Sequence, residues 1–492
     1  MIRRPQPVAL GCVLSALLTL AGAGPVVALD LATLSEYVTP TFSERLRGEF
    51  TDWFRPPPGT APAGAQRYSF LASQLRAGVR VTLPRVQLVV EMQDTRLVGL
   101  PDDASLAPPI GNLGPGATYF ANTHDTDQGE PFLKLAHLTL RQSGFSATVG
   151  RFEYSDGLET IPGDPALAQL KRQRIGERLV GPFAFTHVTR SFDGVRGAFD
   201  SPAWNATAVA LRPTHGGFEV SANREIGDIG LAGLALTKKG LPWLETSDLR
   251  LFWLYYEDAR DNPLKVDNRP LAVRAADHDE IAVHSVGAHA VAVADAGPGR
   301  VDGLLWGTVQ KGEWGRDGHD AWAWAAEAGY QLPRLPLAPW LRVGWNRSSG
   351  DDDPSDGHHD TFFQLIPTPR TYALFPFYNL MNIDDVFAQL LFQPHTRVRA
   401  RIDYHRLRVT DGGDLWYSGG GATNDDVFGF AGSPAAGRHG LAHVVDLSLT
   451  VTLPWRLTLG GYYGHAFGGE VVGATFAGRD ADYGFVEATY RY

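Results

Sequence analysis

The chain has very little cysteine and no apolar run long enough to cross a bilayer as a helix. Its 492 residues include one cysteine, Cys12, and the apolar stretch at residues 8–21 falls short of the roughly 20 residues that a helical span needs. Positive charge is in deficit, with 44 lysines and arginines against 54 aspartates and glutamates. These absences argue against a helical membrane protein, a disulfide-stabilised domain and a nucleic-acid partner.

The amino terminus has the pattern of a secretory signal. Arg3 and Arg4 precede the apolar stretch, and Val26 stands at the −3 position of a cleavage site after Ala28. This arrangement predicts a signal peptide at 1–28, which contains Cys12, followed by a single mature domain at 29–492.

What is abundant is glycine and aromatic residues, and the last strand shows their arrangement. The chain has 55 glycines, and its mean hydropathy is only −0.15. Near the carboxyl terminus one face carries Tyr492, Tyr490, Ala488, Val486 and Gly484, and the other carries Arg491, Thr489 and Glu487. A strand can span a bilayer only if its sheet closes on itself. The pattern therefore predicts an all-β fold, a transmembrane antiparallel up-and-down β-barrel.

Turn signals divide the chain into about 18 strands. Short turns rich in Gly and Pro are expected at 83–85, 142–144, 200–202, 296–299, 393–395 and 453–455, with longer ones near 238–246 and 331–339. Long connections are expected at 55–67, 98–130, 154–186, 214–227, 259–280, 349–379 and 411–438, with shorter ones near 313–319 and 469–480. Short periplasmic turns and long extracellular loops are typical of outer-membrane barrels, and several of the long connections are expected to form folded extracellular loops or lumen plugs.

Tryptophans follow several of the expected turns. Trp204, Trp340 and Trp455 are predicted to form a periplasmic aromatic girdle together with Tyr492. The alternative is that they pack in the core of a water-soluble β-sandwich.

Strand parity predicts an arginine-lined lumen, because residues that alternate with a lipid-facing apolar set must point inward. The candidate substrate-binding residues are Arg45, Arg47, Arg76, Arg80, Arg141, Arg196, Arg250, Arg342, Arg397, Arg399, Arg401 and Arg456. Of these, Arg397, Arg399 and Arg401 form a ladder on one face, which an anionic solute would complement.

Acidic residues are also expected to face the lumen. They are Glu49, Glu91, Glu327, Asp403, Asp446 and Glu487. The alternative interpretation is therefore a lumen of paired charges that merely keeps the wall polar.

Four segments of the mature chain resemble the outer-membrane alginate export family. They are Gly150-Arg151-Phe152-Glu153, Phe192-Asp193-Gly194-Val195-Arg196-Gly197, Ser348-Ser349-Gly350-Asp351 with the following Phe362 and Pro367-Thr368, and Asp414-Leu415-Trp416-Tyr417. The resemblance implies an eighteen-stranded barrel in the bacterial outer membrane, with an electropositive pore that conducts a polyuronate chain. After Thr368 the chain departs from the family pattern of a His and paired tyrosines, which leaves the substrate open.

One loop contains residues that suggest other chemistry. Asp351, Asp352, Asp353 and Asp356 offer oxygen ligands for Ca²⁺, but the EF-hand spacing fails and a solvated acidic loop is expected. His358 and His359 suggest a barrel hydrolase, yet no local motif supplies a nucleophile and an orienting group. We therefore expect no enzyme activity, no metal site and no cofactor.

The resulting function is an outer-membrane channel for export of an anionic polysaccharide, such as an alginate-like polyuronate. A porin for small anionic nutrients is the alternative, and a barrel hydrolase is the third class. The expected partners are the anionic permeant, outer-membrane lipid and, for export, periplasmic secretion proteins.

Overall fold

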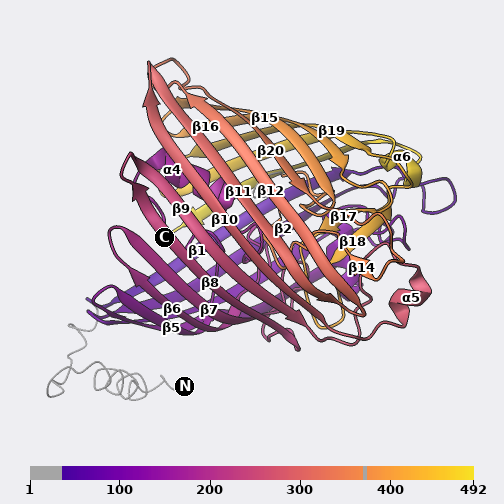
Figure 1. Cartoon of the computed structure of the whole chain (residues 1–492), viewed down its shortest axis with the longest axis horizontal. Coiled ribbons are helices and arrows are strands. Elements are labelled where there is room, and N and C mark those ends of the chain that lie inside the picture. The colour runs from indigo at the N-terminus through magenta and orange to yellow at the C-terminus, as the bar shows by residue number, and fades with distance from the viewer. Residues whose placement is uncertain (1–35, 370–373) are drawn as a thin grey trace, which may run out of the picture.

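The computed structural model describes residues 36–369 and 374–492, so the expected signal peptide at 1–28, with Cys12, lies outside the described residues. Within them, eighteen strands form one closed antiparallel barrel, which confirms the predicted fold (Figure 1). The strands of the wall are β1 (Val38–Asp52), β2 (Arg67–Thr82), β3 (Val86–Val98), β4 (Asp127–Gln142), β5 (Phe145–Phe152), β6 (Phe192–Asp200), β7 (Trp204–Pro213), β8 (Ile229–Leu241), β9 (Leu244–Asp258), β10 (Ile281–Ala296), β11 (Gly299–Trp314), β12 (Asp317–Gln331), β13 (Trp340–Ser348), β15 (Ile383–His395), β16 (Val398–Val409), β19 (Gly440–Thr452), β20 (Leu457–Gly468) and β21 (Asp480–Arg491).

The connections carry a few short elements. They are α3 (Pro115–Thr123), α4 (Pro165–Leu170), the π-helical turn η1 (Lys171–Ile175), α5 (Leu271–Ala275), β14 (His358–His359), β17 (Leu415–Gly419), β18 (Phe430–Pro434) and α6 (Val472–Thr475). None of the helices in the described part of the chain has the length and apolar character to cross a bilayer. Figure 1 shows α5, α6 and the β17–β18 hairpin at one end of the barrel and the carboxyl terminus at the other.

The barrel closes where its first and last strands pair. β1 is antiparallel to β2 on one side and to β21 on the other, and in this register Arg47 lies opposite Glu487. Closure leaves the sheet without a free edge, which is the condition for a strand-built wall in lipid.

Side chains alternate between lipid and lumen along the strands. In β21, Val486 is 69% exposed on the outside, whereas Glu487 points inward to Arg45 and Arg47. The predicted faces of the last strand are confirmed at these positions. In β2, Val79 is 43% exposed on the outer face, and Arg76 contacts residues inside the barrel.

Short turns occur at the end of the barrel where the carboxyl terminus lies. They join β2 to β3, β4 to β5, β6 to β7, β8 to β9, β10 to β11, β12 to β13, β15 to β16 and β19 to β20. Ser143 and Gly144 both have positive φ, 49° and 85°, as a two-residue primed turn requires. The predicted division into short turns and long loops is confirmed.

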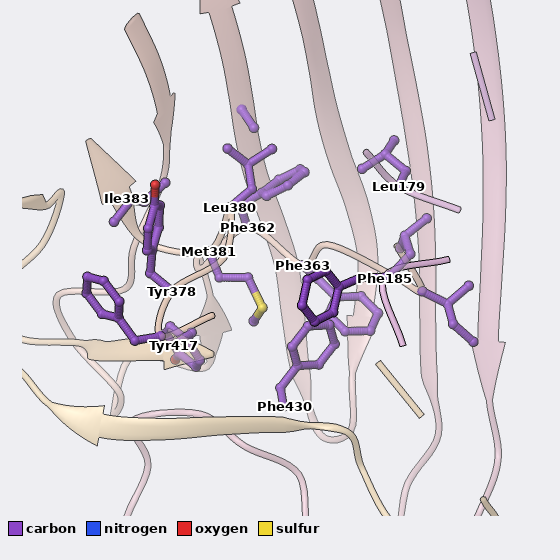
Figure 2. Close-up of a cluster of buried hydrophobic side chains, with 14 of the residues drawn as sticks. Leu179, Phe185, Phe362, Phe363, Tyr378, Leu380, Met381, Ile383, Tyr417 and Phe430 are labelled. Atoms are coloured by element: carbon purple, nitrogen blue, oxygen red, sulfur yellow. The ribbon is translucent and has the colours of Figure 1, made fainter. Parts of the chain in front are cut away.

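Three long connections fold into the barrel and pack against one another. We name residues 153–191 the lumen loop; its partners are the loops at 349–382, described except for 370–373, and at 410–439. A parallel bridge joins Val180 to Ile366. Figure 2 shows Leu179 of the lumen loop in the same cluster of buried hydrophobic side chains as Phe363 and Phe430. Burying an aromatic side chain contributes about 2–3 kcal/mol, so this cluster stabilises the packing of the three loops against one another inside the barrel.

Two of the three predicted girdle tryptophans lie outside the barrel, and the third does not. Trp204 is 44% exposed and Trp455 is 82% exposed. Trp340 is buried, and its indole N–H donates to Asp302 Oδ2 at 2.7 Å. The prediction for Trp340 was wrong, because β13 begins on an inward position and Leu341 takes the outward one.

Candidate functional site

The lumen loop runs along the inside of the barrel from one end toward the other. It begins after Phe152, at the long-loop end of β5. Asp164, which caps α4, forms an ion pair of 2.7 Å with Arg300, beside the short turn between β10 and β11. Lys171 of η1 pairs with Asp248 of β9 at 2.8 Å. The loop therefore reaches the short-turn end of the lumen and narrows it.

Predicted lumen arginines hold this loop against the wall. Arg45 donates to the carbonyl oxygens of Ala184, Phe185 and Thr186 at 3.0–3.2 Å, and its Nε lies 2.6 Å from Glu487. Its neighbour on the same face, Arg47, also donates to Phe185 O and pairs with Glu487 at 2.7 Å. The guanidinium groups of these two residues are therefore already bound by oxygen atoms of the protein itself.

Arg250 anchors the start of the lumen loop. Its Nη2 lies 2.6 Å from Asp156 and 2.7 Å from Glu159, and all three side chains are almost completely buried. Ion pairs this deep are costly to break, because the remaining charge is left in a medium of low dielectric.

Arg342 belongs to a cluster around Glu327 of β12. Arg174, Arg178 and Arg342 approach this carboxylate at 2.8, 3.3 and 2.9 Å, and Arg342 also pairs with Asp302 at 3.1 Å. The cluster joins the lumen loop to β11, β12 and β13 through buried charges.

Arg76 is also paired. It lies 3.3 Å from Glu153 and donates to Gln93 at 2.8 Å. Lys134 of β4 reaches the same Glu153 at 3.0 Å.

A different group of predicted arginines has no carboxylate partner among the described residues. Arg80, Arg141 and Arg196 project inward from β2, β4 and β6 near the short-turn end. Arg141 donates only to an amide oxygen, that of Gln87, at 3.0 Å. Arg80 and Arg141 are exposed to the lumen. We call these three residues the open arginines.

The predicted ladder on β16 is only partly formed. Arg399 lines a cavity of about 370 Å³ with Arg47, Arg401, Gln173 and Gln331, and no ion pair is found for Arg399 in the described part of the chain. Arg401 pairs with Asp403 at 2.8 Å. Arg397 is exposed in the turn before β16, which starts one residue later, so it adjoins the strand that carries Arg399 and Arg401.

Arg456 was placed wrongly. It lies in the turn between β19 and β20 with a φ of 62°, and its Cζ stands 4.9 Å from the ring centroid of Tyr492. The turn runs to residue 456, so strand parity does not apply to this position.

Sequence reasoning missed the basic residues of the lumen loop itself. Lys171, Arg174 and Arg178 all form buried ion pairs with the wall. Burial lowers the pKa of Lys171, while the Asp248 carboxylate opposes that effect. Their clustering within eight positions of an expected long loop is a signal that was visible in the sequence.

The acidic loop is only partly solvated. Asp352, Asp353 and Asp356 are exposed as expected, but Asp351 is buried, with its backbone N–H donating to Asp414 Oδ2 at 3.2 Å. Thr361 and Tyr417 also donate to Asp414, at 2.6 and 2.7 Å. Among the described residues the four loop aspartates do not converge into a metal-ligand group.

The two loop histidines lie in different surroundings. The ring of His359 stacks on Trp314 with centroids 4.0 Å apart, and its Nδ1 lies 3.0 Å from Nδ1 of His319. His358 is exposed. In the described part of the chain, neither ring is hydrogen-bonded to a hydroxyl or thiol, the arrangement that nucleophilic catalysis requires.

Comparisons agree with a channel. The model of the family described as "Alginate export" matches residues 38–487. No curated protein matches the chain. The barrel is similar to OccK9 (OpdG) of Pseudomonas aeruginosa, with a TM-score of 0.57, 12% identity, and 92% of this chain and 98% of that chain covered.

Two further solved structures share the fold. The outer membrane protein opdK of Pseudomonas aeruginosa has a TM-score of 0.54 and 11% identity, over 92% of this chain and 99% of that one. OccK2 (OpdF) of the same organism, solved in complex with glucuronate, has a TM-score of 0.55 and 11% identity, over 93% of this chain and 98% of that one. At these identities the likeness concerns the fold, a closed antiparallel outer-membrane barrel.

Proposed function

We propose that this chain, which belongs to the alginate export family and forms a channel in the bacterial outer membrane, conducts an anionic polysaccharide of the alginate-like polyuronate type. Membership of the family rests on a match across residues 38–487. The choice of permeant rests on the lumen charges described above.

The observation that carries the proposal is the division of the lumen arginines into two sets. One set is already paired with carboxylates and carbonyl groups of the protein itself: Arg45, Arg47 and Arg250. The open arginines have no such partner among the described residues and remain available to a passing carboxylate. A guanidinium binds a carboxylate through two parallel hydrogen bonds and stays charged at any relevant pH.

The open arginines lie near one mouth of the barrel, a position that suits conduction of an anion. Several cations that each bind weakly lower the entry barrier without trapping the permeant. A polyuronate presents one carboxylate per sugar, so successive units exchange between Arg80, Arg141 and Arg196 as the chain advances. Delivery to this mouth by periplasmic secretion proteins is part of the same proposal.

A small-anion porin is the second candidate, and the lumen loop favours it. The loop reaches the short-turn end and narrows the lumen, which suits a solute of one or two sugars better than a polymer. The glucuronate complex of OccK2 shows that a barrel of this architecture accepts a sugar carboxylate.

Single-channel recording in planar bilayers with oligouronates of increasing length separates the two. A polysaccharide conduit gives current blocks whose duration rises with oligomer length, and neutral oligosaccharides of equal length give none. Blocks that disappear beyond a disaccharide would favour the small-anion porin, and indifference to all uronates would contradict both.

A further inference from the structure

Two aspartates face each other on neighbouring strands of the wall. Asp403 of β16 and Asp446 of β19 are direct cross-strand partners, and both point inward with 1% of their surface exposed. His405, two residues along β16, is equally buried. Like charges directly opposite on adjacent strands repel, and burial increases the cost.

Several atoms of these three residues lack hydrogen-bond partners among the described residues. They are both carboxylate oxygens of Asp403, Nε2 of His405 and Oδ2 of Asp446. One ligand atom from each residue falls in a group whose members all lie within 4.8 Å of one another. Buried polar atoms are almost always satisfied, so such a convergence calls for a missing partner.

Surrounding residues orient the three side chains. His405 Nδ1 lies 2.9 Å from Oδ1 of Asp385, which sits on β15. The Tyr462 hydroxyl donates to Oδ1 of Asp446. Each contact occupies the far side of the ring or carboxylate and leaves His405 Nε2 and Asp446 Oδ2 directed toward the shared space. A carboxylate on the second nitrogen of a histidine is the usual support of a metal ligand.

Nearby cations do not neutralise the group. Arg401 Nε is 2.8 Å from Asp403 Oδ2, although this oxygen has no hydrogen bond of normal geometry in the described structure. Arg174, the next guanidinium, is engaged by Glu327. Three carboxyl groups, those of Asp385, Asp403 and Asp446, therefore share one guanidinium, Arg401, and one imidazole, His405.

We propose that Asp403, His405 and Asp446 bind a divalent transition-metal ion, with Zn²⁺ as the best match. One imidazole and two carboxylates are ordinary Zn²⁺ ligands at about 2.0–2.2 Å, with a further position open to water. In a tetrahedral site around such an ion the ligand atoms are about 3.4 Å apart, so side-chain rotations must bring the three atoms closer together than they are now. Ca²⁺ prefers six to eight oxygens and fits the single imidazole poorly.

A cavity lies next to the proposed site on the lumen side. The cavity of about 370 Å³ is bounded by Arg401 and Tyr462, each of which contacts one of the proposed aspartate ligands. The ion would join β16 to β19 and replace the carboxylate repulsion by coordination, so its binding stabilises the folded barrel.

The test uses the full mature barrel without an affinity tag, refolded, treated with chelator and titrated with Zn²⁺. We expect one tightly bound ion per chain by elemental analysis, a rise in the unfolding temperature, and visible absorption of a four- or five-coordinate site when Co²⁺ is added instead. The variants His405→Gln and Asp446→Asn should each lose at least about tenfold in affinity, as expected when a metal ligand is removed.

The control variant is His289→Gln. His289 is a buried inward histidine that contacts Asp248 at 2.8 Å but belongs to no metal-ligand group among the described residues. It should retain the ion. Zn²⁺ binding that survives in both ligand variants would show that the ion binds elsewhere, at surface histidines, and would overturn the proposal. Absence of binding by the wild-type barrel would overturn it as well. If one ligand variant does not fold, the Co²⁺ spectrum of the wild-type protein and the other variant still decide the question.

Discussion

Arg47 and Glu487 lie opposite each other across the pair of strands that closes the barrel, and their side chains form an ion pair of 2.7 Å inside the lumen. The same guanidinium donates to the carbonyl oxygen of Phe185 in the lumen loop. The buried Arg47 guanidinium therefore contributes both to closing the barrel and to holding the lumen loop in place.

Replacing Glu487 by Gln should destabilise this closure. Arg45 and Arg47 both pair with Glu487, so the variant leaves two guanidinium groups short of a counter-charge. We expect a loss of about 3 kcal/mol in the free energy of unfolding, measured by urea titration in detergent. The variant Glu44→Gln is the control, because Glu44 lies on the outer face of β1 and accepts a hydrogen bond from Ser73 of β2. Equal stability of both variants would argue against a structural role for the pair.

Replacing Arg250 by Met should free the first part of the lumen loop. Asp156 and Glu159 would remain buried without their cation, which costs about 3–5 kcal/mol and favours withdrawal of the segment from the wall. Single-channel conductance should rise and become noisier. The double variant Arg250→Met with Asp156→Asn should recover part of the wild-type trace; a single variant with unchanged conductance would show that this anchor does not limit the pore.

The buried pair Asp351 and Asp414 predicts a pH-dependent loop. Burial raises the pKa of both carboxyls to about 7, and the Asp414 charge adds to the effect on Asp351. The folded state therefore binds these protons more tightly than the unfolded state. Its extra stability is present below about pH 4 and is lost as pH rises through about 7.

Hydrogen bonds from Thr361 and Tyr417 stabilise the Asp414 carboxylate and reduce this effect, and we expect a loss of about 2 kcal/mol in loop stability between those limits. Hydrogen exchange of the amides at 351–353 and 414–415, corrected for intrinsic rates, measures it. Asp351→Asn should flatten the dependence, whereas Asp352→Asn, at an exposed position, should not. A flat wild-type profile would contradict the assignment.

The fold was largely predictable because each strand carries its own signal. Alternation of apolar and polar residues fixes which face meets lipid, and turns such as Ser143–Gly144 need residues that tolerate positive φ. Predicted side-chain positions were wrong where a turn began or ended one or a few residues away from its expected boundary. Arg456 and Trp340 both adjoin turns, where parity cannot be counted from the sequence.

The candidate site was less predictable because charge pairing depends on contacts between distant segments. Arg250 meets Asp156 only because the lumen loop returns into the barrel, and nothing local in either segment specifies that path. The opposition of Asp403 and Asp446 likewise follows from the register of β16 and β19. Strand parity identified both aspartates as inward but not as neighbours.

The most direct test of the account is the reversal potential of the channel in a salt gradient, for the wild type and for a variant with Arg80, Arg141 and Arg196 all changed to Gln. The wild type should be anion-selective, and the variant should lose most of that preference while folding normally, since these arginines form no ion pair among the described residues. Arg406→Gln, on the outer face of β16, is the control and should behave as the wild type. An unchanged reversal potential in the triple variant would contradict the proposal that the open arginines select the permeant.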